Sequence, residues 1–600
     1  MALNIEDYAL IGDCHTGAMV GRDGSIDWLC LPRFDSPSIF GALLGTDDHG
    51  RWKVAPAGAV VSTSRRYLGD SFVLVTTWVT ESGEIEVTDL MPTGDRRADV
   101  VRSIRGVKGS VDVVEELTLR FDYAAALPWV RQIRDSDGGH ALVAIAGPDA
   151  VVMRGPKLSP TGTRHTAHFT VSPGETVELT LTWYPSHRPV PPPLTPASRI
   201  DDTLRWWTKW ASGLTPVARY NDQVRRSLLI LRALTHRDTG GIVAAATTSL
   251  PESIGGSRNW DYRYVWLRDA SLTLDVLLTH GFDDEARGWR NWLLRALAGD
   301  PADVQIMYGL AGERRLDERE IDHLPGYEGS APVRIGNAAF TQYQGDVFGE
   351  VMLALKTARD RGVVETEFSW PLQRAIMAYV EQNWQRPDNG IWEIRGPLRH
   401  FTHSRVMLWA AFDCAIRAVQ DHGLDGPVGR WETHRDALRI EIESEGWNAD
   451  LGSYTQYYGG SGVDASLLQL SQVGFVGASD PRMLGTVAVI ERELLRDGLV
   501  LRYLTQSGID GLAGDEHPFL ACSFWLVEQY AGSGRFDDAV ALMDRLVGFA
   551  NDVGMLSEEY DPLARRQIGN TPQALSHLAL VRAADAILRA DTTSSPINSV

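Results

Sequence analysis

The pattern of hydrophobic and polar positions changes once along this 600-residue chain, near residue 190. Before that point, short runs rich in Val, Thr and Tyr, such as SFVLVTTWVT (71–80) and GEIEVTDLMP (83–92), are separated by Gly, Pro, Asp and Ser. This spacing is typical of strands joined by hairpins. Because no helical pattern interrupts the runs, residues 1–190 are predicted to form an antiparallel β-sandwich.

A proline-rich stretch, PSHRPVPPPLTPAS, follows at residues 185–198. Such a composition favours a stiff, extended connector. The next segment, IDDTLRWWTKWASGL, has the pattern of a single helix. Residues 191–217 are therefore predicted to be a linker that carries one helix.

From residue 218 onward, apolar residues recur at spacings of three and four, and most of these segments end at a glycine. That period indicates amphipathic helices, and glycine is a common helix stop. Many such helices in succession, joined by loops of very unequal length, predict helical hairpins packed in a ring or stack over residues 218–592. The last residues, 593–600, are expected to form a flexible tail. Function is expected in the longest loops, 299–343, 385–402 and 446–480.

Composition narrows the classes of function. The 58 Lys and Arg residues against 78 Asp and Glu residues give a net charge of −20, which disfavours nucleic acid and anionic membrane surfaces as partners. Four cysteines without a CxxC pair predict neither a disulfide framework nor a zinc site. We find no basic leader segment and no apolar run of about 18 residues, so we expect a cytoplasmic protein with a small neutral substrate.

Two acidic positions stand out on predicted loops. Glu393 lies in GIWEIRG, and Glu558 and Glu559 lie in GMLSEEYDP. Glycoside hydrolysis needs two carboxyl groups across a pocket, one protonated to assist the leaving oxygen and one ionised to activate water. Trp392, beside Glu393, would favour the protonated form. The alternative for each glutamate is a solvated loop residue without a catalytic role.

A third segment, NWDYRYVWLRDASLTL (259–274), combines aromatic, basic and acidic residues directly before a predicted helix. Arg268 and Asp269 at the helix start could form a structural salt bridge. They could equally bind sugar hydroxyls, because arginine donates five hydrogen bonds and aspartate accepts several. The pattern alone leaves both interpretations open.

Taken together and in order, the motifs resemble glycoside hydrolase family 15, the glucoamylase family, and within it the branch of actinobacterial trehalases. The resemblance covers nearly the whole chain and is carried by RNWDYRYVWLRDA, VQIMYGLAGERRLDEREIDHLPGY, PVRIGNAA, GIWEIRG, FTHSRVMLWAA, GLVLRY, CSFWLV and LSEEYDP. It implies an N-terminal β-sandwich, a linker and an (α/α)6 barrel, with exo-acting hydrolysis that inverts the anomeric configuration.

The resemblance also implies roles for the two glutamates. Glu393 matches the general acid of the family, and Glu558 matches the general base. The family motif around the base is usually Pro-Glu-Gln, whereas this chain has Ser557-Glu558-Glu559, which differs on both sides. The register favours Glu558 over Glu559.

Further residues match the substrate-binding positions of the family. Trp266, Arg268 and Asp269 would hold the non-reducing glucose, and Tyr262 would lie near its ring and the attacking water. Trp392 would shield the general acid. Arg395 stands close behind the acid, at Ile394-Arg395, where eukaryotic glucoamylases commonly carry a second acidic residue. Arg395 is expected to contact the leaving sugar, and that departure suits a leaving group other than a starch chain.

The predicted function is hydrolysis of a small α-glucoside, most plausibly trehalose, by two glutamates. One alternative is a glucoamylase-like α-glucosidase that acts on maltose, isomaltose or short dextrins, and another is a sugar-binding protein without turnover. The chemistry requires no metal or organic cofactor, although some trehalases of this branch depend on phosphate. The sequence leaves the oligomeric state open, including a homo-oligomer.

Overall fold

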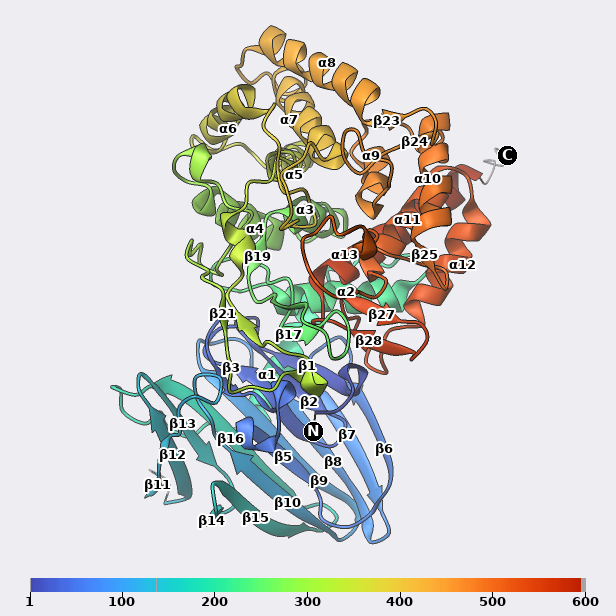
Figure 1. Cartoon of the computed structure of the whole chain (residues 1–600). Helices are drawn as coiled ribbons and strands as arrows, with labels where there is room; N and C mark the ends of the chain where they lie inside the picture. The colour runs from blue at the N-terminus through green and yellow to red at the C-terminus, as the bar shows by residue number, and fades with distance from the viewer. Residues whose placement is uncertain (1, 136–137, 595–600) are drawn as a thin grey trace, which may run out of the picture.

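The computed structural model describes residues 2–135 and 138–594 and divides into a β domain and a helical domain (Figure 1). The β domain, coloured blue to teal, holds the N-terminal part of the chain, and the helical domain stands above it in this view. This order agrees with the predicted sandwich followed by a barrel. Residues 595–600 of the predicted tail lie outside the described residues, and 593–594 are the end of the last helix.

Two antiparallel sheets form the β domain. One sheet has the strand order β1-β2-β3-β5-β10-β15-β14, with β4 paired to β3, and the other has the order β11-β12-β13-β16-β9-β8-β7-β6. Their bounds are β1 Tyr8–Gly12, β2 Gly17–Gly21, β3 Ser25–Cys30, β4 Ser38–Phe40, β5 Arg51–Pro56, β6 Val60–Tyr67, β7 Leu74–Thr80, β8 Gly83–Leu90, β9 Ala98–Gly109, β10 Val111–Thr118, β11 Trp129–Arg134, β12 His140–Ala146, β13 Asp149–Arg154, β14 Ser159–Thr161, β15 Arg164–Val171 and β16 Thr176–Pro185.

The two sheets pack face to face because alternate residues of their strands are apolar. Ile85 and Val87 of β8, and Val113 and Leu117 of β10, are fully buried, whereas the residues between them are mostly less buried. This period of two is what an antiparallel sheet with one covered face requires.

Beyond the linker, helices alternate between an outer and an inner ring, as in an (α/α)6 barrel. Their bounds are α1 Pro196–Ala211, α2 Asn221–Leu234, α3 Arg268–Thr279, α4 Asp283–Ala296, α5 Asp346–Asp360, α6 Ser369–Asn383, α7 Thr402–Gln420, α8 Val428–Glu445, α9 Gln469–Gln472, α10 Pro481–Leu494, α11 Leu520–Gly532, α12 Phe536–Val547 and α13 Ala574–Ser594.

The inner ring consists of α3, α5, α7, α9, α11 and α13. Helix α3 packs against α5, α5 against α7, the 3-10 turn Ala465–Leu468 before α9 against α7 and α11, and α11 against α13. The last of these closes the ring, because Arg582 of α13 lies 3.1 Å from both Asp275 of α3 and Glu528 of α11. Among the described residues, no helix is both long and apolar enough to cross a membrane.

Short hairpins in the loops shape one end of the barrel. They are β17 Thr248–Pro251 with β18 Asn259–Asp261, β19 Val265–Trp266 with β20 Met307–Tyr308, β21 Arg319–Glu320 with β22 Arg334–Ile335, β23 Trp447–Asn448 with β24 Ser453–Tyr454, β25 Leu495–Arg496 with β26 Leu499–Val500, and β27 Glu559–Asp561 with β28 Arg566–Ile568. All six pairs lie in loops that lead from an outer helix into an inner one.

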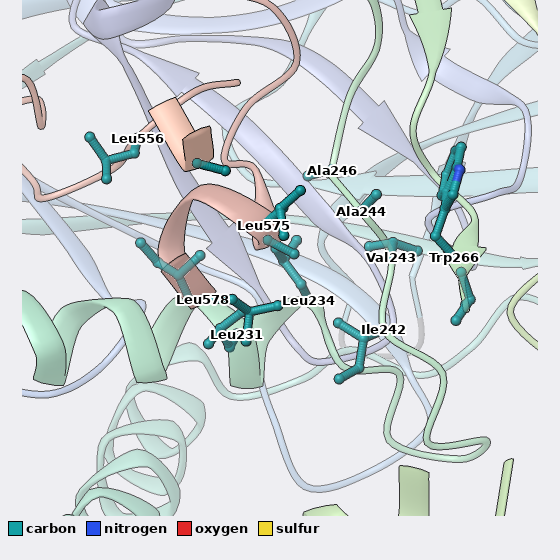
Figure 2. Close-up of a cluster of buried hydrophobic side chains, with 14 of the residues drawn as sticks. Leu231, Leu234, Ile242, Val243, Ala244, Ala246, Trp266, Leu556, Leu575 and Leu578 are labelled. Atoms are coloured by element: carbon teal, nitrogen blue, oxygen red, sulfur yellow. The ribbon is translucent and has the colours of Figure 1, made fainter. Parts of the chain in front are cut away.

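A buried apolar cluster supports these loops from below (Figure 2). Leu231 and Leu234 of α2 face Leu575 and Leu578 of α13, and the segment 242–246 runs past them toward Trp266. Burying a large apolar side chain of this kind stabilises a fold by about 1.5–3 kcal/mol. The cluster therefore fixes the base on which the loop before α3 rests.

The β domain is joined to that same loop by a buried arginine. Arg263 is fully buried, forms an ion pair with Asp261 at 2.6 Å, and donates hydrogen bonds to the carbonyl of Ser36 (3.0 Å) and the hydroxyl of Tyr123 (2.9 Å) in the β domain. Because a buried guanidinium requires such partners, the position of neighbouring Tyr262 depends on both domains.

Candidate active site

A small cavity lies among the loops that enter α3, α5, α7 and α11. Its volume is about 50 Å³. The cavity is lined by Glu252, Arg258, Trp260, Tyr262, Arg268, Asn337, Trp392, Glu393, Arg395, Arg502, Tyr503, Leu512 and Phe519.

Glu393 stands on a tight loop that the backbone holds closed. The backbones of Asp388 and Arg399 form an antiparallel β-bridge at the base of the loop. Within the loop, the amide of Ile394 donates to the carbonyl of Asn389 at 3.0 Å. Glu393 itself has a φ of 57°, a left-handed conformation that is uncommon for residues other than glycine. Such strain persists only where the surroundings enforce it, and it often marks a functional position.

The carboxyl group of Glu393 contacts two residues of the segment before α3. The indole Nε1 of Trp266 donates a hydrogen bond of 2.6 Å to its Oε1, and Nη1 of Arg268 lies 3.6 Å from the same oxygen. Burial raises the pKa of Glu393, while Arg268 and the Trp266 hydrogen bond act in the opposite direction. The net rise favours a proton on this carboxyl group, as a general acid requires.

The pair Arg268–Asp269 forms the salt bridge that was one of the two interpretations left open by the sequence. Nε of Arg268 bonds to Oδ1 of Asp269 at 2.9 Å, so a salt bridge is present. Nη1 of Arg268 also donates to the carbonyl of Ile391 at 3.1 Å, which ties α3 to the loop of Glu393. Arg268 lines the cavity, whereas Asp269 is not among the lining residues and contacts Arg268.

Glu558 lies on the other side of Tyr262. The phenol of Tyr262 donates a hydrogen bond of 2.6 Å to Oε1 of Glu558, and Oε2 has no hydrogen-bond partner among the described residues. Burial first, and then the neighbouring carboxylate of Glu252, raise the pKa of Glu558 to about 8. A free, buried carboxylate oxygen beside a cavity is suited to accept a proton from water.

Glu559 has a different environment from its neighbour. Its Oε2 accepts a hydrogen bond of 2.9 Å from the amide of His517, and its Oε1 lies 3.4 Å from Nη2 of Arg502. It belongs to strand β27 and is fully buried. Glu559 therefore differs from Glu558 in having a backbone amide bound to one oxygen and the guanidinium of Arg502, which also lines the cavity, beside the other.

The sequence analysis missed a third carboxyl group at the site, that of Glu252. Glu252 follows β17, is 1% exposed, and lines the cavity. Oxygens of Glu252, Glu558 and Glu559 all lie within 4.8 Å of one another, a spacing that could bind a cation. However, Nη2 of Arg502 lies 2.8 Å from Oε1 of Glu252, so positive charge is already present at these oxygens. The donor set fits a guanidinium and a shared proton better than a metal ion.

Trp392 and Arg395 both line the cavity, but their contacts are with residues that the sequence analysis did not single out. Nε1 of Trp392 donates to Asp464 at 2.9 Å, so the indole is fixed beside the acid while Trp266 makes the hydrogen bond to it. The guanidinium of Arg395 lies 4.4 Å from the ring centre of Trp260 and pairs with Glu318 at 3.0 Å.

The structure brings the predicted site residues together: Tyr262, Arg268, Trp392, Glu393 and Arg395 line the cavity. Trp266, Asp269 and Glu558 each contact one of these five. Two further residues of the cavity, Arg502 and Glu252, were not predicted as site residues. Arg502 lies in GLVLRY, a motif that was noted without a role, so a signal for it existed. Glu252 follows an ordinary strand pattern in TTSLPES, and no local signal distinguished it.

Comparison with known proteins identifies the family to which the chain belongs. The family profile described as Glycosyl hydrolases family 15 matches residues 218–585, and a second profile, Trehalase-like, N-terminal, matches residues 1–184. The chain is 35% identical to a trehalase of Mycolicibacterium smegmatis, with 98% of this chain and 92% of that protein covered. It is 32% identical to a trehalase of Thermoplasma volcanium, with 99% and 95% covered.

Among solved structures, a bacterial glucoamylase in complex with acarbose matches with a TM-score of 0.71. The match covers 98% of this chain and 94% of that one, at 13% identity. At this identity the likeness concerns the fold, and it extends over both domains.

Proposed function

The chain belongs to glycosyl hydrolase family 15, and from that premise we propose that it hydrolyses trehalose to glucose with inversion of configuration. The observation that carries the proposal is that one segment joins two glutamates, the buried Glu558 and the partly buried Glu393. Trp266 bonds to Glu393 and Tyr262 bonds to Glu558, and the rings of Tyr262 and Trp266 meet edge to face at 5.4 Å. The relatives named trehalase support the choice of substrate.

In the proposed mechanism, Arg268 and Asp269 bind the terminal glucose, and Glu393 protonates the glycosidic oxygen. Glu558 removes a proton from a water molecule, which attacks the anomeric carbon from the opposite face. Inverting enzymes hold the two carboxyl groups about 6.5–9.5 Å apart to leave room for this water. The chemistry needs no metal or organic cofactor, and dependence on phosphate stays a prediction. The proposal keeps the predicted cytoplasmic location, which fits four buried cysteines that are all free.

The proposal is tested by proton NMR of fresh enzyme with trehalose, with maltose and isomaltose in parallel. We expect trehalose to be cleaved fastest and to give equal amounts of α- and β-glucose at early times, because only one of its two anomeric carbons is attacked. If trehalose stays intact while maltose or isomaltose gives β-glucose, the enzyme is instead a glucoamylase-like α-glucosidase. Only α-glucose from trehalose would contradict inversion.

The pH dependence of kcat/KM should reflect the pKa values of the catalytic carboxyl groups. The base must be ionised, so activity should fall as the pH drops through the pKa of Glu558, which lies near 8. Replacing Glu252 by Gln removes a negative neighbour and should lower that pKa. The acidic limb of kcat/KM should therefore move to lower pH.

The measurement is a normalised pH profile of kcat/KM for the wild type and Glu252→Gln, with the exposed Glu81→Gln as a charge-matched control. An acidic limb that stays in place, or moves to higher pH, would remove Glu252 from the environment of the base.

A further inference from the structure

The mouth of the cavity contains a charged and aromatic cluster that the proposed mechanism does not use. Trp260 and Arg395 line the cavity, and the guanidinium of Arg395 lies over the indole ring of Trp260 at 4.4 Å from its centre. Arg334 lies over the same ring at 4.7 Å. The carboxylate of Glu318 contacts both cations, at 3.0 Å for Arg395 and 3.6 Å for Arg334. We refer to these four residues as the rim cluster.

Glu318 restricts Arg395 to one orientation. Nη2 of Arg395 donates to Oε2 of Glu318, and the backbone amide of Arg395 donates to the carbonyl of Asp510 at 3.0 Å. In the described part of the chain, Nε and Nη1 of Arg395 have no hydrogen-bond partner. The guanidinium is therefore held by one nitrogen and by its flat face, and the remaining donors are free for a ligand at the mouth.

Glu318 is itself held in place by the chain around it. Its Oε2 also accepts a hydrogen bond of 3.1 Å from the amide of Ala338, and the adjacent residues 319–320 form strand β21 against β22. A carboxylate that is already bound to a backbone amide and lies beside a second guanidinium loses little freedom when it positions a further group. The orientation of Arg395 is thus built into the loop.

The loop between β21 and β22 reaches the β domain, as Figure 1 shows beside the label β21. Nε2 of His323 lies 2.8 Å from the carbonyl of Tyr123, and the hydroxyl of Tyr327 donates to the carbonyl of Leu3 at 3.0 Å. The amide of Gly326 donates to another carbonyl of the β domain, at 3.0 Å. The rim cluster is therefore supported by the domain that carries none of the proposed catalytic groups.

We propose that Glu318 is a positioning residue for the leaving sugar, because it holds Arg395, which lines the cavity, over the ring of Trp260 and leaves donors of the guanidinium unbonded by the residues that the structure describes. The cluster suits a hexopyranose. The hydroxyl oxygens of such a sugar accept hydrogen bonds from a guanidinium, and its C–H faces pack on an indole. This inference rests on the proposed function, in which the sugar that leaves is the second glucose of trehalose.

The test compares two substrates that share the first glucose and differ in the leaving group. Trehalose has a second glucose at the rim cluster, whereas α-glucosyl fluoride releases only fluoride. We expect Glu318→Gln to lower the ratio of kcat/KM for trehalose to kcat/KM for α-glucosyl fluoride by about tenfold or more, because a charge-assisted hydrogen bond is lost. The exposed Asp322→Asn, in the same loop, is the matched control.

A double substitution separates positioning from a general loss of structure. Arg395→Lys keeps the charge but cannot lie flat on Trp260 or donate in a fork. If Glu318 acts through Arg395, the double variant Glu318→Gln/Arg395→Lys should lower the ratio no further than Arg395→Lys alone. Additive losses would overturn the inference.

The remaining outcomes are also decisive. In one of them, the wild type hydrolyses both substrates while Glu318→Gln has the same ratio of kcat/KM for trehalose to kcat/KM for α-glucosyl fluoride. That result would overturn the role of Glu318 and leave the proposed function intact. An equal fall of the ratio in Asp322→Asn would do the same. A wild type that hydrolyses α-glucosyl fluoride but not trehalose would overturn the proposed function and the inference with it.

Discussion

Replacing Glu393 by Gln should lower kcat for trehalose by about a thousandfold, because protonation of the leaving oxygen by a positioned acid contributes roughly 10²–10⁴-fold. The amide keeps the shape of the side chain and can still accept the hydrogen bond from Trp266, so the fold should persist. With α-glucosyl fluoride the loss should be far smaller, since fluoride leaves with little help from an acid. Steady-state kinetics on both substrates provide the measurement.

Glu81→Gln, an exposed change of the same chemistry, controls for the substitution itself. Circular dichroism should be the same for all variants. If Glu393→Gln hydrolyses trehalose within a few-fold of the wild type, Glu393 is not the general acid.

Replacing Glu558 by Gln should lower kcat by a similar factor, about 10²–10⁴, but for both substrates. The base activates the attacking water whichever group leaves, so fluoride cannot compensate for its loss. This common loss distinguishes the base from the acid. It also decides between neighbours, since Glu559→Gln keeps the Tyr262–Glu558 pair and should retain more activity.

A thermal melt must accompany these kinetics, because Glu559 is buried against Arg502 and its replacement leaves that cation with fewer partners. We expect Glu559→Gln to lower the melting temperature and Glu558→Gln to change it less. If Glu559→Gln is folded and inactive on both substrates while Glu558→Gln is active, the base is Glu559.

The fold was accessible from the sequence because its signals are repetitive. A period of two before residue 190 and a period of 3.6 after 218 are each repeated many times, so single errors do not change the conclusion. The ring closure by α13 could not be read in this way. It depends on contacts such as Arg582 with Asp275, which are 307 residues apart.

The candidate site was only partly accessible for the same reason. Glu393 stood out because turn residues isolate it beside Trp392, and the resemblance supplied Glu558 and the segment of Tyr262. Glu252 and Glu318 had no such signal. Their importance arises from distance in space, since Glu252 lies 306 positions before Glu558 and yet within 4.8 Å of it. Periodicity and motifs do not encode contacts of that kind.

The buried link through Arg263 has a consequence for how this architecture is inherited. Its guanidinium donates hydrogen bonds to the carbonyl of Ser36 and the hydroxyl of Tyr123 in the β domain. Arg263 directly follows Tyr262, the residue that contacts Glu558. A gene truncated to the barrel would lose these hydrogen-bond acceptors and expose the loop of Arg263 to water, so the position of the adjacent Tyr262 would no longer be fixed from that side. The two domains therefore constitute one selectable unit: recombination that exchanges either alone must also replace the residues that meet Arg263.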